Sequence, residues 1–162
     1  TAYEIRLSLV GSEMCIRDRG VVEYRSAVAD VRPLLTQCSV YVLPSYHEGM
    51  PRSVLEAMAT GRPVITTDTI GCREMVLNAG PRDANDIRVG DNGLLVPVRR
   101  VEPLAAAMLR LASDAGLRGE MGRRGREIVE QHFDVRLIND VMLREMDLLP
   151  ASEGRQRPPL NS

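Results

Sequence analysis

Two short apolar runs, separated by a loop and a helix-like segment, constrain the fold of this 162-residue chain more than any other feature. Residues 39–43 (SVYVL) and 63–67 (PVITT) are rich in β-branched side chains, a pattern typical of strands buried on both faces of a parallel sheet. Between them, Pro51 opens a helical segment and Gly61 ends it, where these residues are favoured. Strand, loop, helix and strand in under thirty residues predict a right-handed βαβ unit.

The segments next to this unit continue the pattern of an α/β domain. Asp30 stands where an N-cap is expected and Pro33 falls in the first helical turn that would follow. The elements expected beside the unit are a strand at 21–24, a helix over 30–37, a short helix within 71–77, a polar surface excursion over 78–90 and a strand at 93–98. We therefore expect an α/β fold with a Rossmann-like parallel sheet and flanking helices.

Three further helices are predicted at the C-terminal end of the chain. The first is indicated by apolar residues on one face, Leu104, Met108 and Leu111. The second, over 117–132, has Arg123, Arg124 and Arg126 on its exposed side. The third is capped by Asp134 and has Leu137, Val141 and Leu148 on one face. The chain is thus expected to have a helical C-terminal end.

Charge and cysteine content exclude several classes of protein. The formal net charge of −1 argues against a nucleic-acid-binding module, and no apolar run approaches the ~18 residues of a membrane span. Cys15, Cys38 and Cys72 form no CxxC pair, and His47 and His132 stand alone, so neither a disulfide framework nor a structural zinc is expected. We therefore expect a soluble, cytoplasmic domain without a metal.

All 21 basic residues are arginine, which we interpret as codon bias toward a GC-rich genome. A phosphate bound by this chain would therefore meet guanidinium groups or backbone amides and never an ammonium group.

The loop after the first apolar run carries the candidate site. It reads PSYHEGMPRSVLE (44–56), and its two carboxylates, Glu48 and Glu56, are eight positions apart. Ligands of open α/β sheets bind at the carboxyl ends of the strands, where this loop lies. The unpaired amides of the following helix, near Arg52 to Val54, suit a diphosphate, and Gly49 allows close backbone approach. Glu56 is placed to accept hydrogen bonds from a diol such as a ribose, which predicts a metal-free site for a sugar-bearing diphosphate.

A purely structural interpretation of the same residues stays open at this point. A Glu-Gly turn before a proline-led helix is common, and Glu56 could be a solvated helix residue paired with Arg52 one turn earlier. His47 is equally compatible with a hydrogen-bonded loop histidine and with a catalytic group.

Residues 47–76 (HEGMPRSVLEAMATGRPVITTDTIGCREMV), with 91–98 (DNGLLVPV), resemble the C-terminal half of retaining family 4 (group 1) glycosyltransferases. Glu48 and Glu56 fill the family's hallmark of two glutamates separated by seven residues, and the resemblance extends from about Gly20 to Met146. It implies the C-terminal, nucleotide-sugar-binding half of a GT-B fold, in which two Rossmann-like domains face each other across the active site.

The resemblance also implies roles for individual residues. Glu48, the catalytic residue, would contact hydroxyls of the transferred sugar and position it rather than act as a general base. Glu56 would bind the ribose. The implied substrate-binding set is His47, Gly49, Met50, Pro51, Arg52, Ser53, Val54 and Glu56, with backbone amides at Gly49 and Met50 beside the sugar and Ser53 and Val54 at the diphosphate. Cys72 is expected to be a packing residue.

Strings such as DVRPLL and EGMPRSVLEAMA further resemble the capsule and exopolysaccharide branch of the family. This implies a UDP-sugar donor, a glycan or polyprenyl-linked acceptor, retention by front-face attack, and peripheral association with the cytoplasmic face of the inner membrane. Alternatives are an inert nucleotide-sugar-binding fragment and an epimerase or phosphorylase of the same fold. The chain departs from the family at Arg25 and Ser26, where a glycine is usual, and it lacks the upstream Arg and Lys pair that neutralises the diphosphate.

Residues 1–19 (TAYEIRLSLVGSEMCIRDR) show no sustained helical or strand period, and they resemble translated sequencing adapter at the ends of unrelated metagenomic reading frames. The alternative is a weakly ordered natural arm. We expect three parts: a non-native leader at 1–19, a partial domain at 20–149 whose acceptor-binding N-terminal partner is missing, and a disordered tail at 150–162.

Overall fold

The structure is a computed structural model that describes residues 23, 25 and 27–146. The chain divides into two units, Thr1–Val31 and Arg32–Ser162, and all the helices and strands given below belong to the second. The expected leader at 1–19, most of the expected strand at 21–24, Leu148 and the tail at 150–162 lie outside the described residues.

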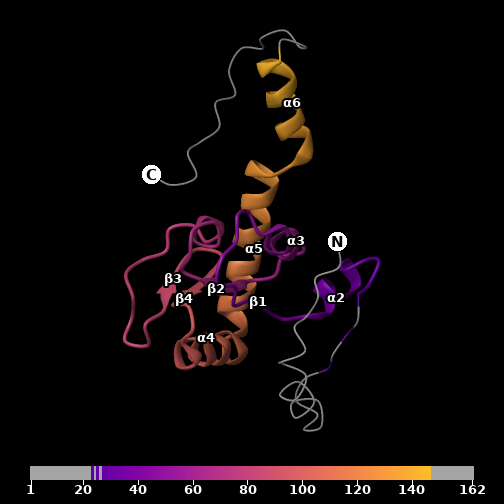
Figure 1. Ribbon diagram of the computed structural model, residues 1–162. Coiled ribbons are helices and arrows are strands. Elements are labelled where there is room, and N and C mark those ends of the chain that lie inside the picture. The colour runs from indigo at the N-terminus through magenta and orange to yellow at the C-terminus, as the bar shows by residue number, and fades with distance from the viewer. Residues whose placement is uncertain (1–22, 24, 26, 147–162) are drawn as a thin grey trace, which may run out of the picture. The chain divides into compact units, whose positions relative to one another are not determined.

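A four-stranded mixed sheet forms the centre of the second unit (Figure 1). Its strands, in spatial order, are β1 (Tyr41–Leu43), β2 (Val64–Thr67), β4 (Gly93–Val96) and β3 (Arg88–Val89). The first three are parallel, with Tyr41 opposite Val64 and Val64 opposite Gly93, which confirms the predicted parallel arrangement. β3 is antiparallel to β4 and was not predicted, because a two-residue strand inside the polar 78–90 segment leaves no hydrophobic pattern.

The βαβ unit forms as predicted, with α3 (Arg52–Ala59) between β1 and β2. Pro51 is the N-cap rather than the first helical residue. At the other end Gly61 adopts φ +71°, its N–H donates to Met58 O at 2.9 Å, and Arg62 N–H donates to Ala57 O at 3.0 Å. This pair of bonds around a left-handed glycine is a Schellman motif, which confirms Gly61 as the helix stop.

Helices cover both faces of the sheet. On one face α3 and α5 (Ala115–His132) pack over Val64 and Leu95; on the other, α4 (Val101–Ser113) packs over Ile65, Leu94 and Val96. α5 crosses the end of α3 so closely that a Cβ on Gly122 would collide with the carbonyl oxygen of Gly61.

The remaining helices agree with the predictions in type and differ at their ends. α2 (Arg32–Gln37) begins two residues after the predicted N-cap Asp30. A 3₁₀ turn, η2 (Arg73–Met75), lies within 71–77, and α6 (Val135–Glu145) is capped by Asp134, whose side chain accepts from Arg136 N–H at 2.9 Å.

The buried face of α4 differs from the prediction. It is formed by Pro103, Ala107 and Leu111, whereas Met108 is 47% exposed. The expected position of Met108 on the buried stripe is therefore wrong, because Met108 lines an open cavity beside β1 together with Val40 and Val42.

Asn92 is a fully buried polar residue that joins two loops. Its Oδ1 accepts from Leu77 N–H at 2.9 Å, and its Nδ2 donates to Met75 O at 2.7 Å. These bonds attach the segment after η2 to the start of β4. Among the helices of the described residues, none is long and apolar enough to cross a membrane.

Candidate functional site

The loop between β1 and α3 emerges at the carboxyl end of the sheet and is attached to β2 by hydroxyl groups. Thr66 Oγ1 donates to Leu43 O at 3.0 Å, and Thr67 Oγ1 donates to Ser45 O. β-Branched polar residues inside a buried strand therefore hold the first residues of the loop that carries Glu48.

A second loop supports Glu48 from the β2 side. Gly71, in the turn after β2, is buried and adopts φ +83°, and a Cβ at this position would collide with the carbonyl oxygens of Glu48 and Gly49. Only glycine fits both this close approach and this backbone conformation. By contrast, a Cβ on Gly49 would meet nothing within 4 Å, so the protein itself does not require a glycine there.

The first turn of α3 presents two free amides. No described residue accepts a hydrogen bond from the N–H groups of Arg52 and Ser53, whereas Val54 N–H donates to Pro51 O at 3.0 Å. The expectation that the Val54 amide is also free is therefore wrong. The side chain of Val54 is fully buried in the core, whereas Arg52 is exposed and Ser53 is half-buried, so Val54 can offer a ligand no side chain. Two free amides at a helix N-terminus remain suited to an anionic group.

The two glutamates have no ionic partner within the described part of the chain. Glu48 is half-buried in the loop, and Glu56 is exposed on α3, one turn after Arg52. Arg52 does not pair with Glu56, so the structural interpretation of Glu56 loses its proposed contact. Both carboxylates are available to hydrogen-bond donors such as sugar hydroxyls.

The other predicted site residues lie on the same loop and helix turn. His47 and Met50 are exposed, and Pro51 is buried as the helix cap. Cys72 is a free cysteine and is fully buried in the core, in agreement with the expected packing role. The described residues contain no group of three or more His, Cys, Asp or Glu side chains placed to hold a metal ion.

The sequence analysis did not predict a cluster of charged residues around Asp68, in the same loop as Gly71. Asp68 follows β2 directly, its side chain is only 7% exposed, and it accepts from Arg73 Nε, from Arg82 Nη2 at 2.7 Å and from Arg88 Nη1 at 3.4 Å. Burial acts to raise the pKa of Asp68, but the hydrogen bond and charge of Arg73 and the charges of Arg88 and Arg82 outweigh it and lower that pKa.

The ion pairs of Asp68 with Arg82 and Arg88 attach the loop that carries Gly71 to the 78–90 excursion. Within that excursion, Arg88 also donates to Ala79 O at 2.7 Å and to Gly80 O at 2.8 Å. The three arginines are 5, 14 and 20 positions from Asp68. No local spacing reveals such a cluster.

Sequence reasoning also missed a cavity on the α4 side of the Glu48 loop. It has a volume of about 450 Å³ and is lined by Pro44, Tyr46, Thr67, Val96, Pro97, Arg99, Arg100, Val101 and Leu104. Arg99 lies with its Cζ 5.2 Å from the centre of the Tyr46 ring. Arg99 also has φ +57°, a conformation that costs a non-glycine residue roughly 1–2 kcal/mol.

Comparison with known proteins gives consistent matches. Residues 1–114 match the family described as glycosyl transferases group 1. The chain is 32% identical over 128 residues to the N,N'-diacetylbacillosaminyl-diphospho-undecaprenol alpha-1,3-N-acetylgalactosaminyltransferase of Campylobacter jejuni subsp. jejuni serotype O:2, which covers 79% of this chain and 31% of that protein. It is 30% identical over 129 residues to the capsular polysaccharide biosynthesis glycosyltransferase CapM of Staphylococcus aureus, with the same two coverages.

Among solved structures, Anabaena HepE in complex with UDP-glucose has a TM-score of 0.74, with 22% identity over 91% of this chain and 38% of that one. At this identity the match shows the fold alone, and it confirms the predicted GT-B type of domain. The chain spans less than a third of the length of the two relatives named above.

Proposed function

Because the chain belongs to the group 1 glycosyltransferases, we propose that it is the donor-binding part of an enzyme that transfers a sugar from a UDP-sugar to a glycan or polyprenyl-linked acceptor. The observation that carries the proposal is that Glu48 and Glu56, which pair with no described residue, stand in the sequence on either side of Arg52 and Ser53, whose amides no described residue accepts from. The relatives named above act, by their names, in the synthesis of capsular polysaccharide or on a diphospho-undecaprenol-linked sugar.

Each part of the site has a proposed task. The Arg52 and Ser53 amides bind the donor diphosphate, to which the helix N-terminus adds partial positive charge. Glu56 accepts hydrogen bonds from the ribose hydroxyls. Glu48 accepts hydrogen bonds from hydroxyls of the transferred sugar and orients it, with the Gly49 and Met50 amides alongside. Gly49 leaves room for this approach, because no atom of the described residues lies within 4 Å of a Cβ placed there.

In the proposed reaction the acceptor hydroxyl attacks the anomeric carbon from the face that the diphosphate leaves. The bond from that carbon to the diphosphate oxygen breaks, the new glycosidic bond forms on the same face, and the acceptor proton passes to the leaving diphosphate. The anomeric configuration is thereby retained. The protein contributes positioning and stabilisation of the leaving group, and no metal is required in this proposal.

We assign most of the acceptor site to a further N-terminal domain of the full-length protein. We place the reaction in the cytoplasm, at the inner face of the membrane when the acceptor is lipid-linked. No nucleic acid takes part.

Replacement of Glu56 tests the donor site. In the full-length gene product, Glu56→Ala should raise the KM for the UDP-sugar roughly tenfold or more and change kcat less, because it removes charge-assisted hydrogen bonds to the ribose. Glu120→Ala is the matched control, since Glu120 is also exposed, helical and without an ion pair to any described residue. Radiolabel transfer that survives Glu56→Ala undiminished would contradict the proposed donor site. The retaining mechanism would be contradicted if NMR of the product showed an inverted anomeric configuration.

A further inference from the structure

We propose that the cavity lined by Tyr46, Arg99 and Arg100 binds the diphosphate and first sugar of a lipid-linked acceptor, and so forms an acceptor subsite within the donor domain. This inference rests on the proposed transferase function. It adds to that function a site on the opposite side of the Glu48 loop from the donor amides.

The cavity lies at the correct end of the sheet for a second substrate. Its lining includes Pro44, which follows β1, Thr67, the last residue of β2, and Pro97, which follows β4. The carboxyl ends of these three parallel strands are the edge at which ligands of such sheets bind. Tyr46 is two residues before Glu48, a span of no more than about 7 Å along the chain. A ligand in the cavity therefore lies next to the loop that carries the proposed catalytic glutamate.

The charge of the cavity suits an anion. Two arginines from successive positions, Arg99 and Arg100, contribute to its wall. Arg99 makes no ion pair with a described residue, and its guanidinium group lies over the Tyr46 ring. Arg100 has only a long contact with Glu102, 3.7 Å between exposed side chains, which leaves its guanidinium donors available. Guanidinium groups bind phosphate oxygens through paired donors, so a diphosphate is the ligand group that these side chains match.

The rest of the lining suits a sugar and the start of an apolar chain. Tyr46 is 64% exposed and presents an aromatic ring at the cavity, and Val96, Pro97 and Leu104 supply apolar surface beside it. Pyranose rings and prenyl chains are bound by such surfaces, whereas a free phosphate gains nothing from them. The combination of two lining arginines, an aromatic ring and apolar walls therefore points to a sugar diphosphate that carries an apolar chain.

The diphosphate of the donor could also bind in this cavity. The positions of α3 and α4 favour the diphosphate of the acceptor instead. The donor amides belong to α3, which packs on the sheet face of Val64 and Leu95. The cavity is bounded by α4 residues and by Val96, which belong to the core cluster of the opposite face. The Glu48 loop lies between the two, as a residue that positions the transferred sugar must.

Replacement of Arg99 tests the subsite in the full-length gene product by equilibrium binding as well as by turnover. The probes are N-acetylglucosamine joined through diphosphate to a short prenyl chain, the uncharged octyl N-acetylglucosaminide, and the UDP-sugar. Arg99→Asn should weaken binding of the diphosphate probe about tenfold, the value of one charge-assisted hydrogen bond, and change binding of the other two by less than about twofold. Asparagine tolerates the left-handed backbone of this position, so the variant keeps the local fold.

Two further variants separate charge from structure. Arg99→Lys should restore part of the affinity, because the charge remains and the paired donors are lost. Arg123→Ala should behave as the wild type, because Arg123 is on the exposed side of α5 and, among the described residues, pairs with Glu127 alone.

Equal binding of the diphosphate probe by wild type and Arg99→Asn would overturn the inference. So would an equal loss for the UDP-sugar, which would assign Arg99 to the donor, and so would failure of the folded wild type to bind the diphosphate probe. Binding of that probe through Arg99 without any sugar transfer would instead refute the proposed function and leave the subsite standing.

Discussion

Gly71 is the residue at which the candidate site depends most directly on the backbone of another loop. A Cβ at this position would overlap the carbonyl oxygens of Glu48 and Gly49, and φ +83° is unfavourable for any side chain. Gly71→Ala should therefore displace the Glu48 loop. We expect sugar transfer to fall by roughly 100-fold, because displacements of about 1 Å have this effect on positioned groups. Steady-state kinetics of the full-length gene product measure it.

Gly119→Ala is the control for the added methyl group, since a Cβ there meets nothing within 4 Å and the residue lies inside α5. This variant should keep full activity and gain up to about 1 kcal/mol of helix stability. If Gly71→Ala retains wild-type kcat and KM, the Gly71 turn has no part in positioning Glu48.

The residues of the site differ in how far their sequence neighbours reveal them. Glu48 and Glu56 are recognisable because their partners are local: one loop, one helix start and a fixed spacing place them. Asp68 and Arg99 were not predicted, because their contacts are distant in the sequence. Arg88 is 20 positions from Asp68, and Tyr46 is 53 positions from Arg99. Local spacing identifies groups on one loop, but charge clusters between loops require the fold.

Asp68 and its arginines act at the scale of elements, because they attach the turn after β2 to the 78–90 excursion. The pKa of Asp68 is lowered from its usual 3.8. The contribution of this carboxylate to stability is therefore complete above about pH 4 and is lost as the pH falls through the lower, folded-state pKa. Asp68→Asn should cost about 2 kcal/mol at neutral pH, because charge-assisted bonds become weaker neutral ones.

Urea unfolding of wild type and Asp68→Asn between pH 7 and pH 2.5 measures this contribution. The difference between the two proteins should be constant near neutrality and should shrink in acid below about pH 4. Glu120→Gln, which changes an exposed carboxylate without an ion pair to any described residue, should match the wild type throughout. A difference for Asp68→Asn that stays constant down to pH 2.5 would show that the charge of Asp68 stabilises nothing.

The elements themselves were predictable where their signals are local. The βαβ unit follows from apolar runs bounded by Pro51 and Gly61, and Asp134 caps α6 as expected. β3 was not predicted, because a strand of two residues is too short to show an alternation of apolar and polar side chains. The buried face of α4 was misplaced because the period alone does not show which side of the helix meets the sheet, and that side is centred on Ala107 rather than Met108.

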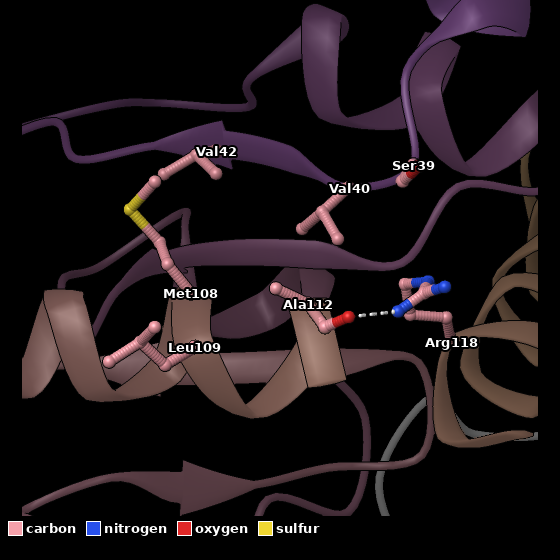
Figure 2. A pocket seen from close by; sticks show the side chains of 7 residues that line it. All are labelled: Ser39, Val40, Val42, Met108, Leu109, Ala112 and Arg118. Atoms are coloured by element: carbon pink, nitrogen blue, oxygen red, sulfur yellow. Dashed lines mark hydrogen bonds between the residues drawn. The ribbon is translucent and has the colours of Figure 1, made fainter. Parts of the chain in front are cut away.

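At the scale of the whole molecule, one side of the sheet lacks a covering element among the described residues. β1 pairs only with β2 there, and beside it lies an apolar cavity of about 540 Å³ (Figure 2). Figure 2 shows Val40 and Val42 on the strand side facing Met108 and Ala112 of α4, with Arg118 donating to Ala112 O at 2.8 Å at one end. Leu109, which also lines the cavity, is 69% exposed.

A strand edge that no described element covers, beside an apolar cavity, predicts that the 162-residue chain alone is marginally stable and self-associates. We expect the purified chain to bind a hydrophobic dye, to elute as oligomers and to transfer no sugar.

Leu109→Ser should reduce dye binding and self-association at little cost in stability. Leu111 is fully buried on the same helix, so Leu111→Ser should lower the free energy of unfolding by roughly 3 kcal/mol or more. A monomeric 162-residue chain that binds no dye would show that this side needs no cover, and sugar transfer by that chain would show that the domain is catalytically sufficient.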